Sequence, residues 1–246
     1  MFAFEIWGGF ASFRDPFTIS QNISLAIPPK TTVAGMMASI LGVEEYFEDD
    51  AFSTFEYSVV VLNPIAKKSF SQNYINDYTY KTQTQINNMK KLDFPKIGEG
   101  LRDKKDPQKP INRELLLNPK YLIIIKNFKY KEKLTIYLKE KMSKFPFYLG
   151  NSEFAGNFSF KEVISSSVEN MKSIKVDSFI LESDINQVDF EEGIRYSTIS
   201  FATVLNKERS PINASSVVLG SKAISVKDME VDKIVCQDDV YHCRFI

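Results

Sequence analysis

Apolar residues recur with two different periods near the start of the chain. Phe2, Phe4 and Ile6 stand at every second position, which is the period of a half-buried strand. A second set of apolar residues then follows the i, i+3, i+4, i+7, i+8 spacing of a buried helix face: Val33, Met36, Met37, Ile40 and Leu41. The pattern predicts a first strand followed by an amphipathic helix.

The residues between and after these two runs indicate where each element stops. Gly8 and Gly9 allow a turn or the close approach of another molecule, and Pro28 with Pro29 keeps the backbone extended before the helix. Thr31 or Thr32 can cap the first free N–H groups of the helix, and Gly42 can end it. We therefore interpret residues 1–42 as a strand, an anion-facing loop and a helix.

The same reasoning gives the order of the following elements. Residues 57–62 form an apolar run that Asn63-Pro64 stops, and the unbroken apolar run 121–125 is typical of a central strand. A second helix is predicted from one apolar face: Leu134, Tyr137, Leu138, Met142 and Phe145. After a loop over residues 146–157, a last strand passes through Phe158, Phe160 and Val163. This βαββαβ order is that of an α+β, ferredoxin-like domain, which is also the RNA-recognition architecture.

Short alternating runs fill the last third of the chain. Turn residues such as Asn206 separate five predicted strands, at residues 176–181, 195–201, 217–219, 223–226 and 240–245. We therefore expect residues 1–170 to form the ferredoxin-like domain and residues 171–246 to form a small antiparallel β lobe.

Residues 67–113 interrupt the first domain between its second and third strands. Periodicity is lost there, and tyrosines are interleaved with Asn, Gln, Lys and Thr before several prolines and glycines. A structureless loop of this length is unusual in a compact domain, so we expect a functional insertion or a projecting hairpin. Residues 78–84 have strand propensity and are a candidate arm of that hairpin.

The formal net charge of zero conceals a strong asymmetry. Residues 67–113 carry eleven basic against five acidic side chains, a net charge of +6, and residues 114–176 carry eleven against six, a net charge of +5. The flanking segments are acidic, because residues 1–66 have two basic against eight acidic side chains and residues 177–246 have seven against twelve. This basic middle can attract an anionic partner, although a solvated lysine-rich surface is an equally simple interpretation.

Several chemistries find no support in the residues. The sequence contains no GxxxxGK[ST], HExxH or GxSxG motif, and His242 is its single histidine, so a serine triad is implausible. Cys236, Cys243 and His242 supply three soft ligands where a closed zinc site needs four, and we interpret the cysteines as reduced thiols. We expect no metal and no cofactor. No run is long and apolar enough to span a bilayer and no secretory signal is evident, so we expect a cytoplasmic protein without a membrane partner.

Two blocks of sequence resemble a known family. Residues 9–14, 27–37 and 41–42 are similar to the amino-terminal signature of the Cas-five family of CRISPR-associated proteins, in the RAMP superfamily, and residues 147–154 are similar to its glycine-containing segment. The blocks cover about a fifth of the chain, in the family's order and spacing. The resemblance implies a type I-B-like, non-catalytic subunit of a Cascade surveillance complex in antiviral defence. Such a subunit binds the 5' handle of the CRISPR guide RNA, contacts the backbone and large subunits, and meets target DNA indirectly.

The candidate RNA-binding residues come from the matched blocks and the basic insertion. Phe13 and Arg14 follow the first strand as neighbours, so the ring of Phe13 can stack on a base while the guanidinium of Arg14 pairs with a phosphate. Alternatively, Phe13 belongs to the core and Arg14 pairs with Asp15. Lys30 adjoins a helix N-terminus, which favours phosphate. The full set is Phe13, Arg14, Lys30, Thr31, Lys67, Lys68, Tyr74, Tyr78, Tyr80, Lys81, Gly150, Asn151 and Ser152. In the resembled family the insertion acts as a thumb, but no residue motif carries that role over.

Two other functions stay open at this point. One branch of the resembled family is a metal-independent endoribonuclease that processes CRISPR precursor RNA with tyrosine, lysine and an adjacent histidine. Tyr46 lies at a similar distance into this chain, but no Lys-His pair occurs in it, so the remaining roles have no counterpart. The third interpretation is an RNA-recognition module unrelated to CRISPR.

Overall fold

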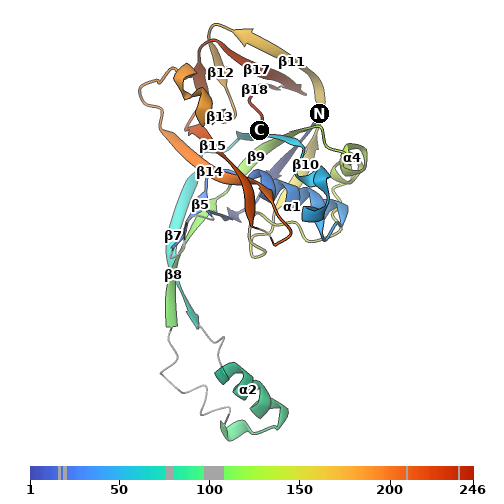
Figure 1. Ribbon diagram of the computed structural model, residues 1–246, viewed down its shortest axis with the longest axis vertical. Helices are drawn as coiled ribbons and strands as arrows, with labels where there is room; N and C mark the ends of the chain where they lie inside the picture. The colour runs from blue at the N-terminus through green and yellow to red at the C-terminus, as the bar shows by residue number, and fades with distance from the viewer. Residues whose placement is uncertain (16–17, 19–20, 76–79, 97–107, 209, 238) are drawn as a thin grey trace.

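The computed structural model describes residues 1–15, 18, 21–75, 80–96, 108–208, 210–237 and 239–246, and it is a strand-rich α+β structure (Figure 1). Its central sheet has four antiparallel strands in the order β10-β1-β9-β6. Their bounds are Asn157–Lys161 for β10, Phe2–Trp7 for β1, Lys120–Lys126 for β9 and Glu56–Val61 for β6. Helix α1 (Lys30–Leu41) lies between β1 and β6 along the chain, and α4 (Lys131–Lys139) lies between β9 and β10.

The two faces of the central sheet are buried against different parts of the chain. Alternate residues such as Phe4, Val59 and Ile123 share one core with α1 and α4. Their neighbours, such as Ala3 and Ile124, pack on the opposite face against strands from the end of the chain. Burial on both faces explains why β9 reads as an unbroken apolar run.

Helix α1 confirms the predicted amphipathic helix and corrects its start. Gly42 ends the helix as predicted, at φ 76°, and its N–H donates to the carbonyl of Ala38 at 2.8 Å. The prediction that Thr31 or Thr32 caps the helix is wrong. The helix already begins at Lys30, before both threonines, and Pro29 occupies the N-cap position without a side-chain hydrogen bond.

Helix α4 is shorter than its apolar spacing predicts. Leu134 and Leu138 are buried, but the helix ends at Lys139, so Met142 and Phe145 do not belong to its apolar face and are exposed. Lys141 adopts φ 54°, which a helix cannot continue through. The N–H of Phe145 instead donates to Ser39 of α1, and this bond ties the following segment to the first helix.

The basic insertion is a long antiparallel hairpin that projects from the body (Figure 1). Strand β7 (Ala66–Ile75) pairs with β8 (Gln108–Leu117), from Ala66 opposite Leu117 to Ile75 opposite Gln108. Helix α2 (Tyr80–Lys90) lies at the far end. The strand predicted for residues 78–84 is therefore wrong where the structure describes it. Residues 80–84 belong to α2, in which the side chains of Gln83 and Asn87 bond each other at helical spacing.

Short strands after β1 fasten the base of the hairpin. Strand β2 (Phe10–Ala11) pairs antiparallel with β8, and β4 (Gln21–Asn22) pairs parallel with the same strand. Strands β3 (Phe13–Arg14) and β5 (Ser24–Leu25) pair with each other. The segment after the first strand is thus held against the root of the insertion.

The last third of the described chain is built from antiparallel strands. They form sheets β11-β17-β18, β12-β16 and β13-β15-β14. The strands are β11 (Val163–Met171), β12 (Ile174–Val176), β13 (Ile180–Leu181), β14 (Tyr196–Leu205), β15 (Pro211–Gly220), β16 (Ile224–Val226), β17 (Met229–Cys236) and β18 (Asp239–Cys243). Short 3-10 helices cover Tyr46–Glu48, Asp50–Phe52 and Glu182–Gln187. The strand predicted from 158 to 163 is two strands, β10 and β11, and β17 was not predicted.

The β-rich third shares its core with the rest of the molecule. Phe179, Phe201, Val217 and Leu219 belong to the same buried cluster as α1 and the central sheet. Among the described helices, none is long and apolar enough to cross a membrane.

Candidate nucleic-acid interface

A cavity of about 370 Å³ lies where three distant segments of the chain meet. One wall comes from β3 and β4, one from β8 at the root of the hairpin, and one from the loop between α4 and β10. Its lining residues are Ser12, Arg14, Asn22, Arg113, Tyr148, Gly150, Asn151, Ser152 and Glu153. The structure therefore brings together the first matched block and the glycine-containing block, which are more than a hundred residues apart in the sequence.

Backbone hydrogen bonds fix the shape of the glycine-containing loop. Tyr148 and Ala155 form an isolated antiparallel bridge, and the N–H of Leu149 donates to the carbonyl of Phe154 at 2.8 Å. The carbonyl of Leu149 in turn accepts the N–H of Ser12 at 3.1 Å. The loop is thus a tight hairpin bonded directly to the segment that follows the first strand.

Gly150 is required at the point of closest approach. Its φ of 90° lies in the left-handed region that favours glycine. A Cβ atom at this position would overlap the carbonyl oxygen of Ser12. The chain can therefore pass Ser12 only with a residue that lacks a side chain.

The residues of this loop that line the cavity have unused backbone donors. In the described part of the chain, the N–H groups of Gly150, Asn151, Ser152 and Glu153 donate no hydrogen bond. Consecutive free N–H groups at a turn form a concave, positively polarised surface that accepts anionic oxygens. Three of these four residues, Gly150, Asn151 and Ser152, belong to the RNA-binding set predicted from the sequence.

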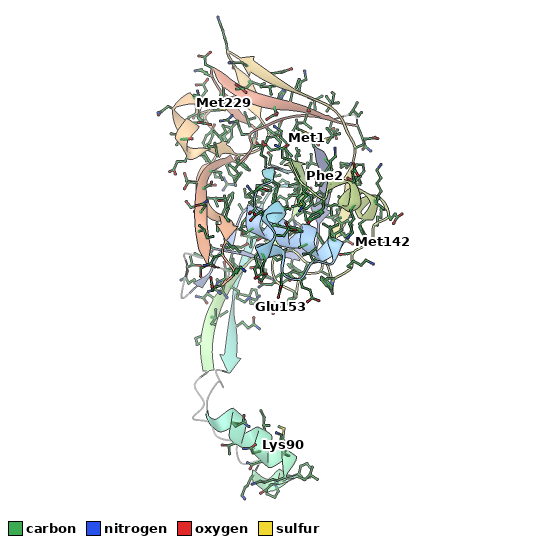
Figure 2. The ribbon with its side chains drawn as sticks, turned by 45° about the vertical axis from the view of Figure 1, so that its right-hand side comes forward. Met1, Phe2, Lys90, Met142, Glu153 and Met229 are labelled. Carbon is green, nitrogen blue, oxygen red and sulfur yellow. The ribbon has the colours of Figure 1, made fainter. Side chains whose placement is uncertain are left out.

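Arg113 supplies a buried cation at the same cavity. Its side chain is 5% exposed, and its guanidinium lies 2.9 Å from a carboxylate oxygen of Glu153 and donates to Gln72 at 2.9 Å. The ring centroid of Phe154 lies 5.9 Å from the guanidinium carbon. Glu153 itself is 57% exposed, and Figure 2 shows it on the body near the base of the hairpin. An exposed carboxylate thus covers a buried, preorganised guanidinium.

Phe13 and Arg14 point to opposite sides of their strand, so only one of them can meet RNA. Arg14 is exposed and lines the cavity. Phe13 is 1% exposed, and its ring lies 6.0 Å from that of Tyr121 in the core. The prediction that Phe13 stacks on a base is therefore wrong, because strand alternation turns it inward.

Lys30 does not lie in the cavity. Its side chain is 8% exposed and its ammonium group lies 5.1 Å from the centre of the Phe55 ring. Burial lowers the pKa of Lys30, and the nearby charge of Glu56 partly opposes that change. The structure thus contradicts the prediction of a phosphate-binding lysine at this helix start, because the charge is held inside the fold.

Thr31 lies in a second cavity, of about 280 Å³, that adjoins the glycine-containing loop. Tyr148 and Gly150 line both cavities. The remaining residues around the second are Thr31, Thr32, Gly35, Met36, Ser39, Tyr46 and Leu205. Tyr46 packs edge-on against Phe47 and Phe52.

The two lysines at the base of the hairpin have different surroundings. Lys67 pairs with Glu114 at 2.8 Å and donates to the carbonyl of Ser24 at 2.8 Å, so it joins β7, β8 and β5. Lys68, the next residue, is exposed and lies opposite Leu115 in the ladder. Of the two, Lys68 has the more accessible charge.

The remaining candidates that the structure describes lie far from the cavity. Tyr74 belongs to β7, and Tyr80 and Lys81 begin α2, at the distal part of the hairpin (Figure 1). Tyr78 lies outside the described residues. The structure does not bring Tyr74, Tyr80 or Lys81 to Arg14 or Gly150.

Sequence reasoning missed four residues at the interface. Arg113 is the last residue of the basic insertion and Glu153 lies inside the second matched block, but nothing in the sequence indicated that the two side chains pair. Phe10 is 47% exposed, and its ring lies 6.4 Å from that of Phe154. Tyr148 is also exposed and lines both cavities. Tyr148 is thus an accessible ring in the same cavity as Arg14, and Phe10 is an accessible ring beside Phe154, which contacts Arg113.

The cysteines and the histidine are remote from this site. Cys236 and Cys243 are both buried, and burial raises the pKa of the Cys236 thiol to about 11. His242 lies 3.7 Å from Glu169, on β11. Within the described residues, no group of three or more His, Cys, Asp and Glu side chains could hold a metal ion.

Comparison with known proteins gives one family match and several structural matches. The family model described as CRISPR-associated protein (Cas_Cas5) matches residues 1–191. A chain of a structure described as a CRISPR RNA-guided surveillance complex is 10% identical with a TM-score of 0.50, over 91% of this chain and 90% of that one. A chain of the Type III-B Cmr-beta complex bound to cognate target RNA and AMPPnP is 13% identical with a TM-score of 0.49, over 91% and 86%. No curated protein sequence matches. The first structural match shows a shared fold.

Proposed function

The chain belongs to the Cas5 family of CRISPR-associated proteins, and from this membership we propose that it is a non-catalytic, guide-RNA-binding subunit of a type I surveillance complex. It grips the repeat-derived 5' handle of the guide RNA at the cavity between β3, β8 and the glycine-containing loop. It contacts the backbone and large subunits of the complex and meets target DNA only through them. We assign its first 170 residues to the ferredoxin-like class and its last third to an accessory β lobe.

One observation carries this proposal. Gly150, Asn151 and Ser152 line the same cavity as Arg14 and the buried Arg113, and within the described residues their N–H groups donate no hydrogen bond. Backbone donors and guanidinium groups are the partners that a phosphodiester chain takes, and exposed Phe10 and Tyr148 offer faces for base stacking. The order of β1, α1, β6, β9, α4 and β10 supports the ferredoxin-like assignment.

The projecting hairpin is proposed to act as a thumb. Lys68 is exposed at its root, and the segment that contains it is the most basic part of the chain. We propose that the hairpin extends along the guide RNA toward the neighbouring subunit. Purifying the chain from its complex and sequencing the 5' end of the bound RNA tests the whole proposal, because a repeat-derived end is required.

Arg14→Ala is expected to weaken binding of the 5' handle roughly tenfold, because one charge-assisted hydrogen bond to phosphate is lost. Titration at several salt concentrations should also show a slope smaller by about 0.7. Lys30→Met is the matched control, since it removes a buried charge while keeping the stem against Phe55. Equal losses in both variants would place the RNA elsewhere.

Glu153→Gln is expected to strengthen handle binding severalfold. The carboxylate of Glu153 competes with RNA phosphate for Arg113, and the neutral amide keeps the side-chain shape while reducing repulsion. The gain should shrink as salt rises, since Glu153 is exposed. Weaker binding in this variant would mean that Glu153 orients Arg113 for RNA instead of covering it.

The purified chain is expected not to cleave its repeat RNA, with or without divalent metal. Tyr46 lines two cavities, and their described lining residues include one carboxylate, Asp49, but no histidine, lysine or arginine. Asp49 already accepts a hydrogen bond from Tyr130, so these cavities do not offer Tyr46 the paired base and acid that ribose chemistry needs. Incubation with end-labelled repeat RNA checks this. Cleavage at one position that Tyr46→Phe or His242→Ala abolishes would establish the processing endoribonuclease instead.

A further inference from the structure

Strand β14 has an open edge. It is the terminal strand of the sheet β13-β15-β14, so among the described strands it pairs with β15 alone. The N–H of Ser221 donates to the carbonyl of Arg195, and this bond shows which residues near the start of β14 direct their backbone groups toward β15: Arg195 and every second residue after it. In an antiparallel pair this alternation directs the backbone groups of Thr198 and Ser200 away from β15. Within the described residues, those outward groups make no hydrogen bond.

This edge lines a cleft of about 940 Å³, the walls of which come from distant parts of the chain. Residues 196–200 of β14 form one side, and residues 60–65, at the end of β6 and in the following turn, form another. Figure 1 shows β14 beside β5 and the root of β7. Exposed Ile23 and Ile65 give the cleft apolar surface.

The neighbouring sheet shows that an extended segment can add to an edge in this molecule. Tyr57 of β6 exchanges both backbone hydrogen bonds with Ile246, at 2.9 and 3.1 Å. That exchange is the pairing of an added antiparallel strand. Beyond it, β6 runs on to residues 60 and 61 in the cleft wall.

The charges in the cleft favour polypeptide over nucleic acid. Carboxylates of Asp15 and Asp177 line it together with Arg195 and Lys222, so its charge is mixed. Lys67 also lines it but is bonded to Glu114 and to a carbonyl oxygen. A nucleic-acid groove would instead be uniformly basic.

We propose that this cleft binds an extended segment of a neighbouring subunit of the surveillance complex, added as a strand to the open edge of β14. The backbone of the segment pairs with Thr198 and Ser200, and its alternate apolar side chains face Ile23 and Ile65. An acidic side chain of the segment lies beside Arg195 and Lys222. This inference rests on the proposed function for the existence of the complex, but not on the RNA site.

Amide hydrogen exchange tests the pairing directly. We compare three samples: the isolated chain, the chain with guide RNA alone, and the complex assembled from the chain, its guide RNA and the neighbouring CRISPR subunits. We expect the amides of Thr198 and Ser200 to exchange at least about tenfold more slowly in the complex only. Protection by RNA alone would make the cleft a nucleic-acid site and overturn the inference.

Two variants at one position add an independent readout. Thr198→Pro removes an outward N–H that β15 does not use, whereas Thr198→Val keeps the N–H and changes the side chain. We expect the proline variant alone to weaken assembly about tenfold, with both variants equally stable to heat. A complex that forms without protection of β14 overturns this inference alone. Failure of the wild-type chain to assemble at all overturns the proposed function as well.

Discussion

Gly150→Ala is expected to be the most damaging single substitution at the RNA interface. The φ of 90° costs an L-residue about 1 kcal/mol, and the new Cβ overlaps the carbonyl oxygen of Ser12. Because a backbone atom cannot swing away as a flexible side chain can, we expect a loss of about 3 kcal/mol or more in the free energy of unfolding. The loop must also move from Ser12, so handle binding should fall with it. Urea denaturation and RNA titration measure the two effects.

Gly193→Ala is the control that separates conformation from contact. Gly193 has a similar φ of 80°, but an added Cβ there would meet no atom within 4 Å. The loss in the free energy of unfolding of Gly193→Ala should stay near the roughly 1 kcal/mol that the backbone conformation alone costs, and RNA binding should be unchanged. Equal losses in the two variants would show that the approach to Ser12 contributes nothing.

Replacing residues 76–107 with a short glycine-serine linker is expected to weaken the affinity for the neighbouring backbone subunit roughly a hundredfold. The replacement removes α2, together with exposed apolar residues at the end of the hairpin: Ile86, Met89, Leu92 and Phe94. It keeps the β7–β8 ladder and the bond between Gln72 and Arg113, so handle binding by the body should change little. Analytical gel filtration of reconstituted complexes and RNA titration give the two measurements.

Leu92→Ser with Phe94→Ser is the smaller companion to this deletion. Both side chains are largely exposed, so thermal unfolding of the isolated chain should be unchanged. If the end of the hairpin meets a subunit through its apolar side chains, the double variant should lose part of the same affinity. Normal assembly of the deletion variant would rule out the thumb.

The central sheet and α1 could be predicted because each has a strong period. The alternation of Phe2, Phe4 and Ile6 and the stripe of Val33 to Leu41 are recovered in β1 and α1. The extent of α4 could not be predicted, because Met142 and Phe145 keep helical spacing although the chain has already turned at Lys141. Strand β17 was not predicted because polar residues such as Lys233 interrupt its apolar alternation.

The candidate site was predicted only in part, for a geometric reason. A two-residue period says that Phe13 and Arg14 face opposite ways, but not which one faces the solvent. The pairing of Arg113 with Glu153 depends on the register of β8 and on the fold of a loop forty residues later. Arg14 and the glycine-containing loop were found because a family motif marked them, and Phe10 was missed because nothing distinguished its ring from those in the core.

The length of the β7–β8 ribbon has a consequence for how tightly the molecule holds its partners. Ten paired residues span roughly 33 Å, so the two proposed contact regions, the Gly150 loop and α2 beyond the far end of the ribbon, are well separated on one chain. Once one region is engaged, the other binds as an intramolecular step at high effective concentration, and two weak contacts combine into a tight one. Shortening or lengthening the ladder in pairs of residues would change this avidity without altering either contact.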